Sequence, residues 1–102
     1  MAIKQIAALR SKAEEAAELM RTLGNPDRLL LLCELSQGEC CVSDLAERSG
    51  IEQPTLSQQL SVLRAQKLVT TRREGKQIFY SVSDARTLAL LKALYRLYCG
   101  ES

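Results

Sequence analysis

The stretch VSDLAERSGIEQPTLSQQLSVLRAQKLVTTRREGKQIFYSV, residues 42–82, decides the fold of this chain. Its first part predicts a short helix from about Val42 to Arg48. Gly50 ends that helix, because glycine readily takes the left-handed conformation found just past a helix. Gln53-Pro54 opens a second helix that continues to about Gln66, since proline suits the first helical turn. The sequence therefore predicts two short helices joined by a tight connection.

A β-hairpin is predicted directly after these two helices. Residues 68–73 and 77–82 are rich in β-branched and aromatic residues, which favour strands. Between them, Glu74-Gly75-Lys76 supplies residues typical of a turn. Two short helices followed by a hairpin is the order of a winged helix-turn-helix.

The chemistry of this stretch points to DNA. Residues 53–80 carry five Lys or Arg against a single Glu, whereas residues 1–52 carry six against nine Asp or Glu. One face of the second helix carries side chains that are short, polar and uncharged, and such side chains can form hydrogen bonds with base edges in the major groove. The hairpin offers basic side chains to phosphates. The alternative is a helical packing module whose hairpin merely lies in solvent, with a basic face that binds nothing.

The rest of the chain adds three helices around this core. Residues 2–22 predict a long amphipathic helix, and Asn25-Pro26 starts another whose body, residues 28–35, is apolar on nearly every side. Asp84 caps a final helix that runs through Tyr98. The fold class is mainly α with a β-hairpin wing, and residues 1–102 form one domain.

Composition narrows the class of protein further. The longest apolar run, Leu29–Cys33, is too short for a signal-peptide core or a membrane span, so we expect a cytoplasmic protein without a membrane partner. In that compartment thiols stay reduced, and the four cysteines point to metal binding, redox sensing or packing. No pattern of catalytic residues stands out, so we expect neither an enzyme nor a cofactor. A small thiol oxidoreductase would need a Cys-x-x-Cys that the chain lacks.

The sequence resembles the ArsR/SmtB family of small dimeric winged-helix repressors across roughly residues 15–99. The likeness rests on LGNPDRLLLL, on the stretch of residues 42–82 and on ALYRLYC near the end. It implies a homodimer through the first and last helices that binds an inverted repeat in double-stranded operator DNA. It also implies a recognition helix and a wing whose DNA-binding residues are Gln53, Thr55, Ser57, Gln58, Gln59, Arg72, Arg73 and Lys76.

Within that family the likeness is greatest to the thiol-based persulfide and redox sensors. They share a cysteine in each of two places, which match Cys33 and Cys99 here. This resemblance implies a repressor that binds its operator while both thiols are reduced. Reactive sulfur species or oxidants would act as inducer by linking the two thiols and so releasing the DNA.

A metal-responsive repressor is the alternative. The family's histidine-based metal site is excluded because the chain has no histidine. Its soft-metal site uses Cys-Val-Cys, and here Cys41-Val42-Ser43 has a hydroxyl in place of the second thiol. Cys40 and Cys41 would then hold arsenite or another soft ion with a third thiol. Otherwise these two cysteines are bystanders or an additional oxidation site.

Overall fold

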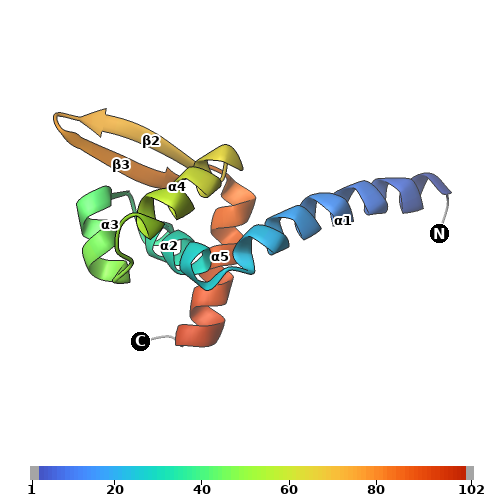
Figure 1. Cartoon of the computed structure of the whole chain (residues 1–102). Coiled ribbons are helices and arrows are strands. Elements are labelled where there is room, and N and C mark those ends of the chain that lie inside the picture. The colour runs from blue at the N-terminus through green and yellow to red at the C-terminus, as the bar shows by residue number, and fades with distance from the viewer. Residues whose placement is uncertain (1–2, 101–102) are drawn as a thin grey trace.

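The computed structural model describes residues 3–100, which form a helical domain with a small antiparallel sheet (Figure 1). The wing hairpin lies at one end of the molecule and the N-terminal part of the first helix at the other. In chain order the elements are α1 (Ile3–Leu23), α2 (Pro26–Ser36), β1 (Cys40–Cys41), α3 (Val42–Ser49), α4 (Thr55–Ala65), β2 (Val69–Glu74), β3 (Gln77–Val82) and α5 (Ala85–Cys99).

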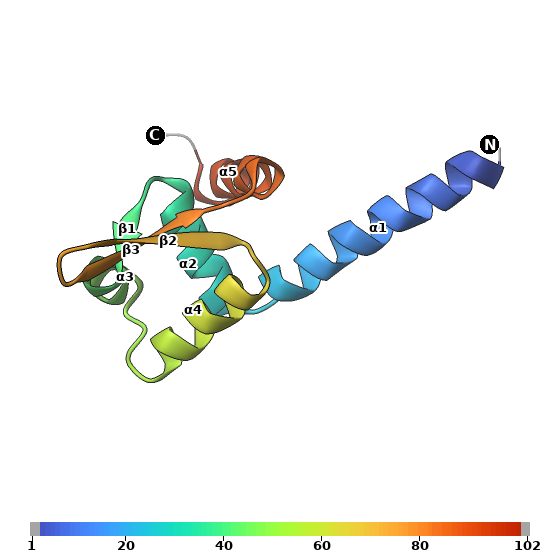
Figure 2. The same cartoon turned by 90° about the horizontal axis from the view of Figure 1, so that it is seen from above.

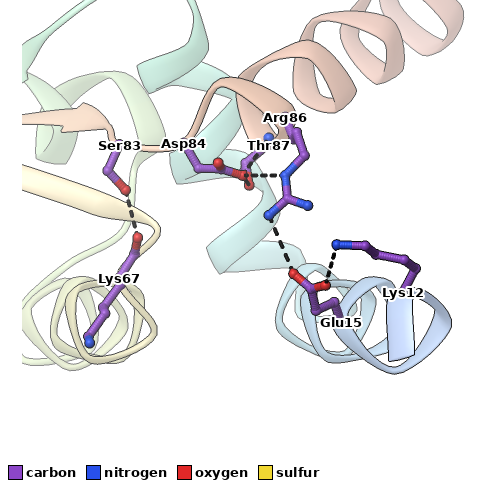
Figure 3. Close-up of polar contacts among 7 residues, drawn as sticks. All are labelled: Lys12, Glu15, Lys67, Ser83, Asp84, Arg86 and Thr87. Atoms are coloured by element: carbon purple, nitrogen blue, oxygen red, sulfur yellow. Dashed lines mark hydrogen bonds and ion pairs between the residues drawn. The ribbon is translucent and has the colours of Figure 1, made fainter. Parts of the chain in front are cut away.

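Local chemistry sets the helix ends as the sequence predicts. The side chain of Asn25 accepts a hydrogen bond from the backbone N–H of Arg28 at 3.1 Å, which caps α2. Gly50 ends α3 in the left-handed conformation, with φ of 71°. At α5, the Asp84 carboxylate accepts from the backbone N–H and the hydroxyl of Thr87 at 3.1 and 2.9 Å (Figure 3).

The core lies where α2 meets the other helices. Helix α2 packs against α1, α3, α4 and α5, so it is the central element, as its apolar sequence predicts. Leu30 is the exception on α2, because 41% of its surface is exposed. The predicted apolar stripe of α4 is confirmed by the burial of Leu56, Leu60 and Leu63. The largest fully buried apolar side chains are Leu31, Leu32, Leu45, Leu56, Leu63 and Leu91.

The sheet contains a strand that the sequence did not predict. Its order is β1-β3-β2, with β1 pairing antiparallel to β3 so that Cys40 faces Tyr80 and Cys41 faces Phe79. The predicted element order placed no strand before α3. Two residues are too few for a strand pattern to show, and only the long-range pairing with β3 makes them one. The wing hairpin of β2 and β3 is confirmed.

Helix α1 extends away from the body of the molecule (Figures 1 and 2). The radius of gyration is 15.4 Å, against about 13 Å for a compact domain of this length. Near its C-terminal half, α1 meets the start of α5, where Glu15 accepts from Lys12 at 3.4 Å and from Arg86 at 3.5 Å (Figure 3). Large apolar side chains of α1 remain exposed, namely Ile6, Leu9 and Met20.

Helix α5 also leaves apolar surface uncovered. The sequence predicts a broad apolar side from Leu88 to Tyr98, yet Leu97 is 75% and Tyr98 84% exposed. The face of α5 that packs inward is centred on Leu91, which is fully buried. Exposed apolar faces on α1 and α5 are the kind of surface that a protein partner covers. Among the described residues, no helix combines the length and the hydropathy that crossing a membrane requires.

Candidate DNA interface and thiol site

Helix α4, which corresponds to the predicted recognition helix, presents a polar face at its N-terminal end. Gln53, Ser57 and Gln58 are exposed, and Thr55 is half-buried. The helix begins at Thr55, slightly later than predicted, and Gln53 lies in the turn before it. There the Gln53 side-chain oxygen accepts from the backbone N–H of Ser57 at 3.1 Å and from its hydroxyl at 2.6 Å. Gln53 therefore satisfies one of the free N–H groups at the start of the helix.

Gln59 lies differently from the other predicted groove residues. It is half-buried, and its side-chain oxygen accepts from Nη1 of Arg28 on α2 at 3.2 Å. The same guanidinium donates from Nε to the backbone oxygen of Thr22, near the end of α1, at 2.9 Å. Arg28 thus connects α1 and α2 to the recognition helix. Spacing along α4 places Gln59 beside Gln58, but only the packing against α2 shows that it turns inward.

The wing carries three exposed cations in two different situations. Arg73 donates from Nε to the backbone oxygen of Gly75 at 3.1 Å, and Lys76 lies at the turn. Arg72 instead faces carboxylates, since it donates to Glu39 from Nε and Nη2, both at 2.7 Å, and to Glu74 from Nη1 at 2.6 Å. Its guanidinium also lies 4.6 Å from the centre of the Phe79 ring.

Glu39 is a site residue that sequence reasoning missed. It directly precedes β1 and is separated from Arg72 by most of the helix-turn-helix, so no short-range pattern joins the two. The hydrogen bonds from Arg72 hold the pKa of the Glu39 carboxyl below its usual value. The same contacts raise the pKa of Arg72, first through Glu39 and then through Glu74. Both groups are therefore charged across the whole physiological range.

Cys33 and Cys99 lie on two helices that pack against each other. Cys33 is half-buried on α2, and Cys99 is exposed at the last position of α5, which packs against α2. The pKa of Cys33 is raised, mostly by burial, then by the charge of Cys99 and then by that of Glu34. The two thiols therefore lie on helices that contact each other, although 66 positions separate them in the sequence.

Cys40 and Cys41 are in a different environment. They are 3% and 4% exposed, and Cys40 belongs to the hydrophobic core. Burial raises the pKa of Cys40, although Arg48 opposes that effect. The sulfur of Cys41 lies 3.3 Å from the Ser43 hydroxyl. Consecutive residues of a strand point to opposite faces, so these two thiols do not converge on one ion.

A metal site finds no support in the geometry. Within the part of the chain that the structure describes, no three His, Cys, Asp or Glu side chains are grouped so that they could hold a metal ion. Cys33 and Cys99 supply two thiols from α2 and α5, and the pair at β1 supplies two that are buried and point apart.

A helix-turn-helix with a polar recognition face and a basic two-stranded wing defines a winged-helix DNA-binding protein. Residues 25–71 match the family described as bacterial regulatory protein, arsR family. The chain is 47% identical to the biofilm growth-associated repressor of Xylella fastidiosa over 93 aligned residues. The alignment covers 91% of this chain and 82% of that repressor. The chain belongs to this family, also called ArsR/SmtB, and is a transcriptional regulator.

Solved structures agree with the fold. The crystal structure of the transcriptional repressor BigR from Xylella fastidiosa superimposes with a TM-score of 0.84 at 46% identity, over 93% of this chain and 97% of that one. Reduced HlyU from Vibrio cholerae superimposes with a TM-score of 0.85 at 36% identity, over 90% and 97%. The predicted fold class, winged helix-turn-helix with five helices and a wing, is confirmed.

Proposed function

We propose that this protein is a cytoplasmic, homodimeric repressor that binds operator DNA while Cys33 and Cys99 are reduced and releases it when they are linked. The observation that carries this proposal is the contrast among the four thiols. Cys99 is exposed and Cys33 half-buried on two helices that pack against each other, whereas Cys40 and Cys41 are buried. Two thiols on contacting helices, at least one of them open to reagents in solution, are suited to a reversible bond.

A persulfide can serve as the two-electron oxidant that joins the two thiols. The exposed Cys99 thiolate takes the outer sulfur of glutathione persulfide and releases glutathione. The Cys33 thiolate then attacks the sulfur attached to the protein, which forms the disulfide and expels hydrogen sulfide. If a second persulfide accepts the electrons instead, the transferred sulfur stays and the bridge contains three sulfurs. Either bridge ties α2 to α5 within one protomer.

The contacts of α2 explain how such a bridge would reach the DNA. Helix α2 packs against α5, and its Arg28 binds Gln59 of the recognition helix. The exposed apolar faces of α1 and α5 suit a dimer interface, so a strained α5 would alter how two recognition helices face an inverted repeat. A coupling free energy of about 1 to 3 kcal/mol would weaken binding roughly 5- to 150-fold.

The test compares reduced and persulfide-treated protein. Intact mass and peptide mapping identify which cysteines are linked, and fluorescence anisotropy follows binding to a duplex selected from a random library by the reduced protein. We expect a Cys33–Cys99 bridge and a fall in affinity that a reductant reverses. C33S and C99S should bind the duplex as tightly as the reduced wild type and should not release it.

C41S is the matched control, because it removes a thiol that the structure buries and should keep the full response. An arsenite arm tests the alternative metalloregulator. Arsenite retained by Cys40 and Cys41, with Cys33 and Cys99 free and DNA released, would replace the dithiol mechanism by a soft-metal one. Loss of DNA binding in both reduced variants, C33S and C99S, would contradict the proposed division between sensing and binding.

A further inference from the structure

Arg72 spans the whole width of the sheet. The sheet order places β1 and β2 on opposite sides of β3, and Arg72 belongs to β2 while Glu39 directly precedes β1. Two parallel N–H···O bonds of 2.7 Å join the Arg72 guanidinium to both oxygens of Glu39. Such two-bond pairing fixes the orientation of both groups as well as their distance. The wing is thereby tied to the connection between α2 and α3.

The strand register explains why this contact crosses β3. Arg72 is the partner of Phe79 on one side, and Cys41 is the partner of Phe79 on the other. Residues directly opposite one another in antiparallel pairs project to the same face, so these three side chains form one row. The guanidinium lies over the Phe79 ring at 4.6 Å, which adds a cation–π contact to the ion pair.

The charge around Arg72 does not favour a phosphate. Glu39 and Glu74 together carry two negative charges against the single positive charge of Arg72. The bonds to these carboxylates use its Nε–H and one hydrogen on each terminal nitrogen. A phosphate would have to displace Glu39 or share a site with a net negative charge. Arg73 differs, since its described bond uses Nε alone and leaves both terminal nitrogens for an anion.

We propose that Arg72 is a positioning residue, which holds the wing in place through Glu39, and that Arg73 and Lys76 are the wing residues that contact phosphates. This reassigns Arg72 from the DNA-contacting set that the family resemblance implies. The inference rests on the DNA binding stated under the proposed function, but it does not depend on the thiol chemistry.

The substitution Glu39→Gln should change DNA affinity in opposite directions, depending on whether Arg72 contacts phosphate or positions the wing. If Arg72 contacts phosphate, removal of the competing carboxylate frees the guanidinium, and the loss of a negative charge near DNA adds to the gain. Affinity would then rise. If Arg72 positions the wing, E39Q weakens the pairing with the guanidinium and the wing loses its fixed orientation. Affinity would fall even though the protein becomes more positive.

The experiment uses the reduced full chain and the selected duplex, with affinity measured by anisotropy at several salt concentrations. E39Q, R72Q and R72K are compared with R73Q and K76Q. Lysine keeps the charge of Arg72 but cannot pair with both oxygens of Glu39 in a fixed fork. E47Q is the matched charge control, because Glu47 is an exposed carboxylate on α3 whose removal changes the net charge equally. Circular dichroism checks that each variant is folded.

We expect E39Q, R72Q and R72K each to weaken binding by roughly two- to fivefold, the range that an exposed ion pair supports. Their salt dependence should match the wild type. R73Q and K76Q should each lower the slope of log affinity against log salt by about 0.9, the value for one phosphate contact. E47Q should bind at least as tightly as the wild type.

The assignment is overturned if E39Q binds as tightly as the wild type or more tightly. It is equally overturned if R72K keeps wild-type affinity while R72Q lowers the salt slope by about 0.9. E39Q replaces one partly exposed carboxylate by an amide and carries the test alone if the Arg72 variants fail to fold. Because every measurement is made on reduced protein, failure of the persulfide response leaves this result unaffected.

Discussion

Alkylation of the four thiols in the folded, reduced protein should follow their burial. A short exposure to iodoacetamide at neutral pH is expected to modify Cys99 first, because it is exposed at the end of α5. Cys33 should follow more slowly, since it is half-buried and its raised pKa leaves less of the reactive thiolate. Cys40 and Cys41 should stay unmodified while the protein is folded.

The size of this protection can be worked out from the position of the buried pair. Cys40 packs in the core with Leu31, Leu45 and other fully buried side chains, so its thiol is reached only when the core opens. Core positions open with a free energy close to that of global unfolding, which is about 5 kcal/mol or more for a stable domain. Each 1.36 kcal/mol is a factor of ten, so Cys40 should react at least about a thousandfold more slowly than Cys99.

Isotope-coded alkylation followed by peptide mapping measures each rate separately. The protein is pulsed with light reagent, unfolded in urea and then labelled with heavy reagent, so that the isotope ratio at each cysteine gives its protection. In urea from the start, all four cysteines should react at similar rates. An alkylation rate of Cys40 or Cys41 in the folded protein within about a hundredfold of that of Cys99 would refute the reasoning, because the free energy of opening the core would then be too small.

Three further outcomes follow from the packing and the pKa shifts, each measured by urea unfolding at a fixed protomer concentration. Leu32→Ala should lower the free energy of unfolding by about 2.7 to 5 kcal/mol, whereas Leu30→Ala, at a partly exposed position, should cost less. Asn25→Ala removes the cap of α2 and should lower the free energy of unfolding by about 0.5 to 2 kcal/mol, and an unchanged value would contradict the role of this cap. The folded state raises the pKa of Cys33, so the stabilisation linked to its protonated thiol is fully present below the pKa of the unfolded state. That stabilisation is lost as the pH rises through the higher pKa of the folded state. The free energy of unfolding of C33S should therefore fall less on the alkaline side than that of the wild type.

Most of the fold could be predicted because local chemistry specifies it. Asn25 and Asp84 start helices by accepting backbone hydrogen bonds, and Gly50 ends one by taking a positive φ. Each of these signals acts over a few residues, so it is visible in the sequence. Strand β1 is different, because two residues become a strand only through pairing with β3, far along the chain. No local pattern could have predicted it.

The roles of individual site residues were harder to predict for the same reason. Positive charge on the wing predicts phosphate contacts, but Arg72 meets Glu39 across the sheet, and that meeting exists only because β1 forms. Gln59 shares the polar character of Gln58 next to it, yet Arg28 draws its side chain inward. Composition and spacing predict which elements form, whereas long-range contacts determine the partners of their individual side chains.

The element on which each cysteine lies limits the bonds that an oxidant can form. Cys40 and Cys41 are neighbours in sequence, but their Cα atoms are about 3.8 Å apart, less than the ~4.4 Å at which disulfides begin, and an extended strand points their thiols to opposite faces. A bond between them would require β1 to leave β3. Cys33 and Cys99 lie on packed helices, and Gly100 ends α5 directly beyond the exposed thiol. We therefore expect the first disulfide formed within a folded protomer to join α2 to α5. Helix α2 forms the centre of the core and α5 carries exposed apolar residues, so this bond would act on both the core and the surface that a partner could cover.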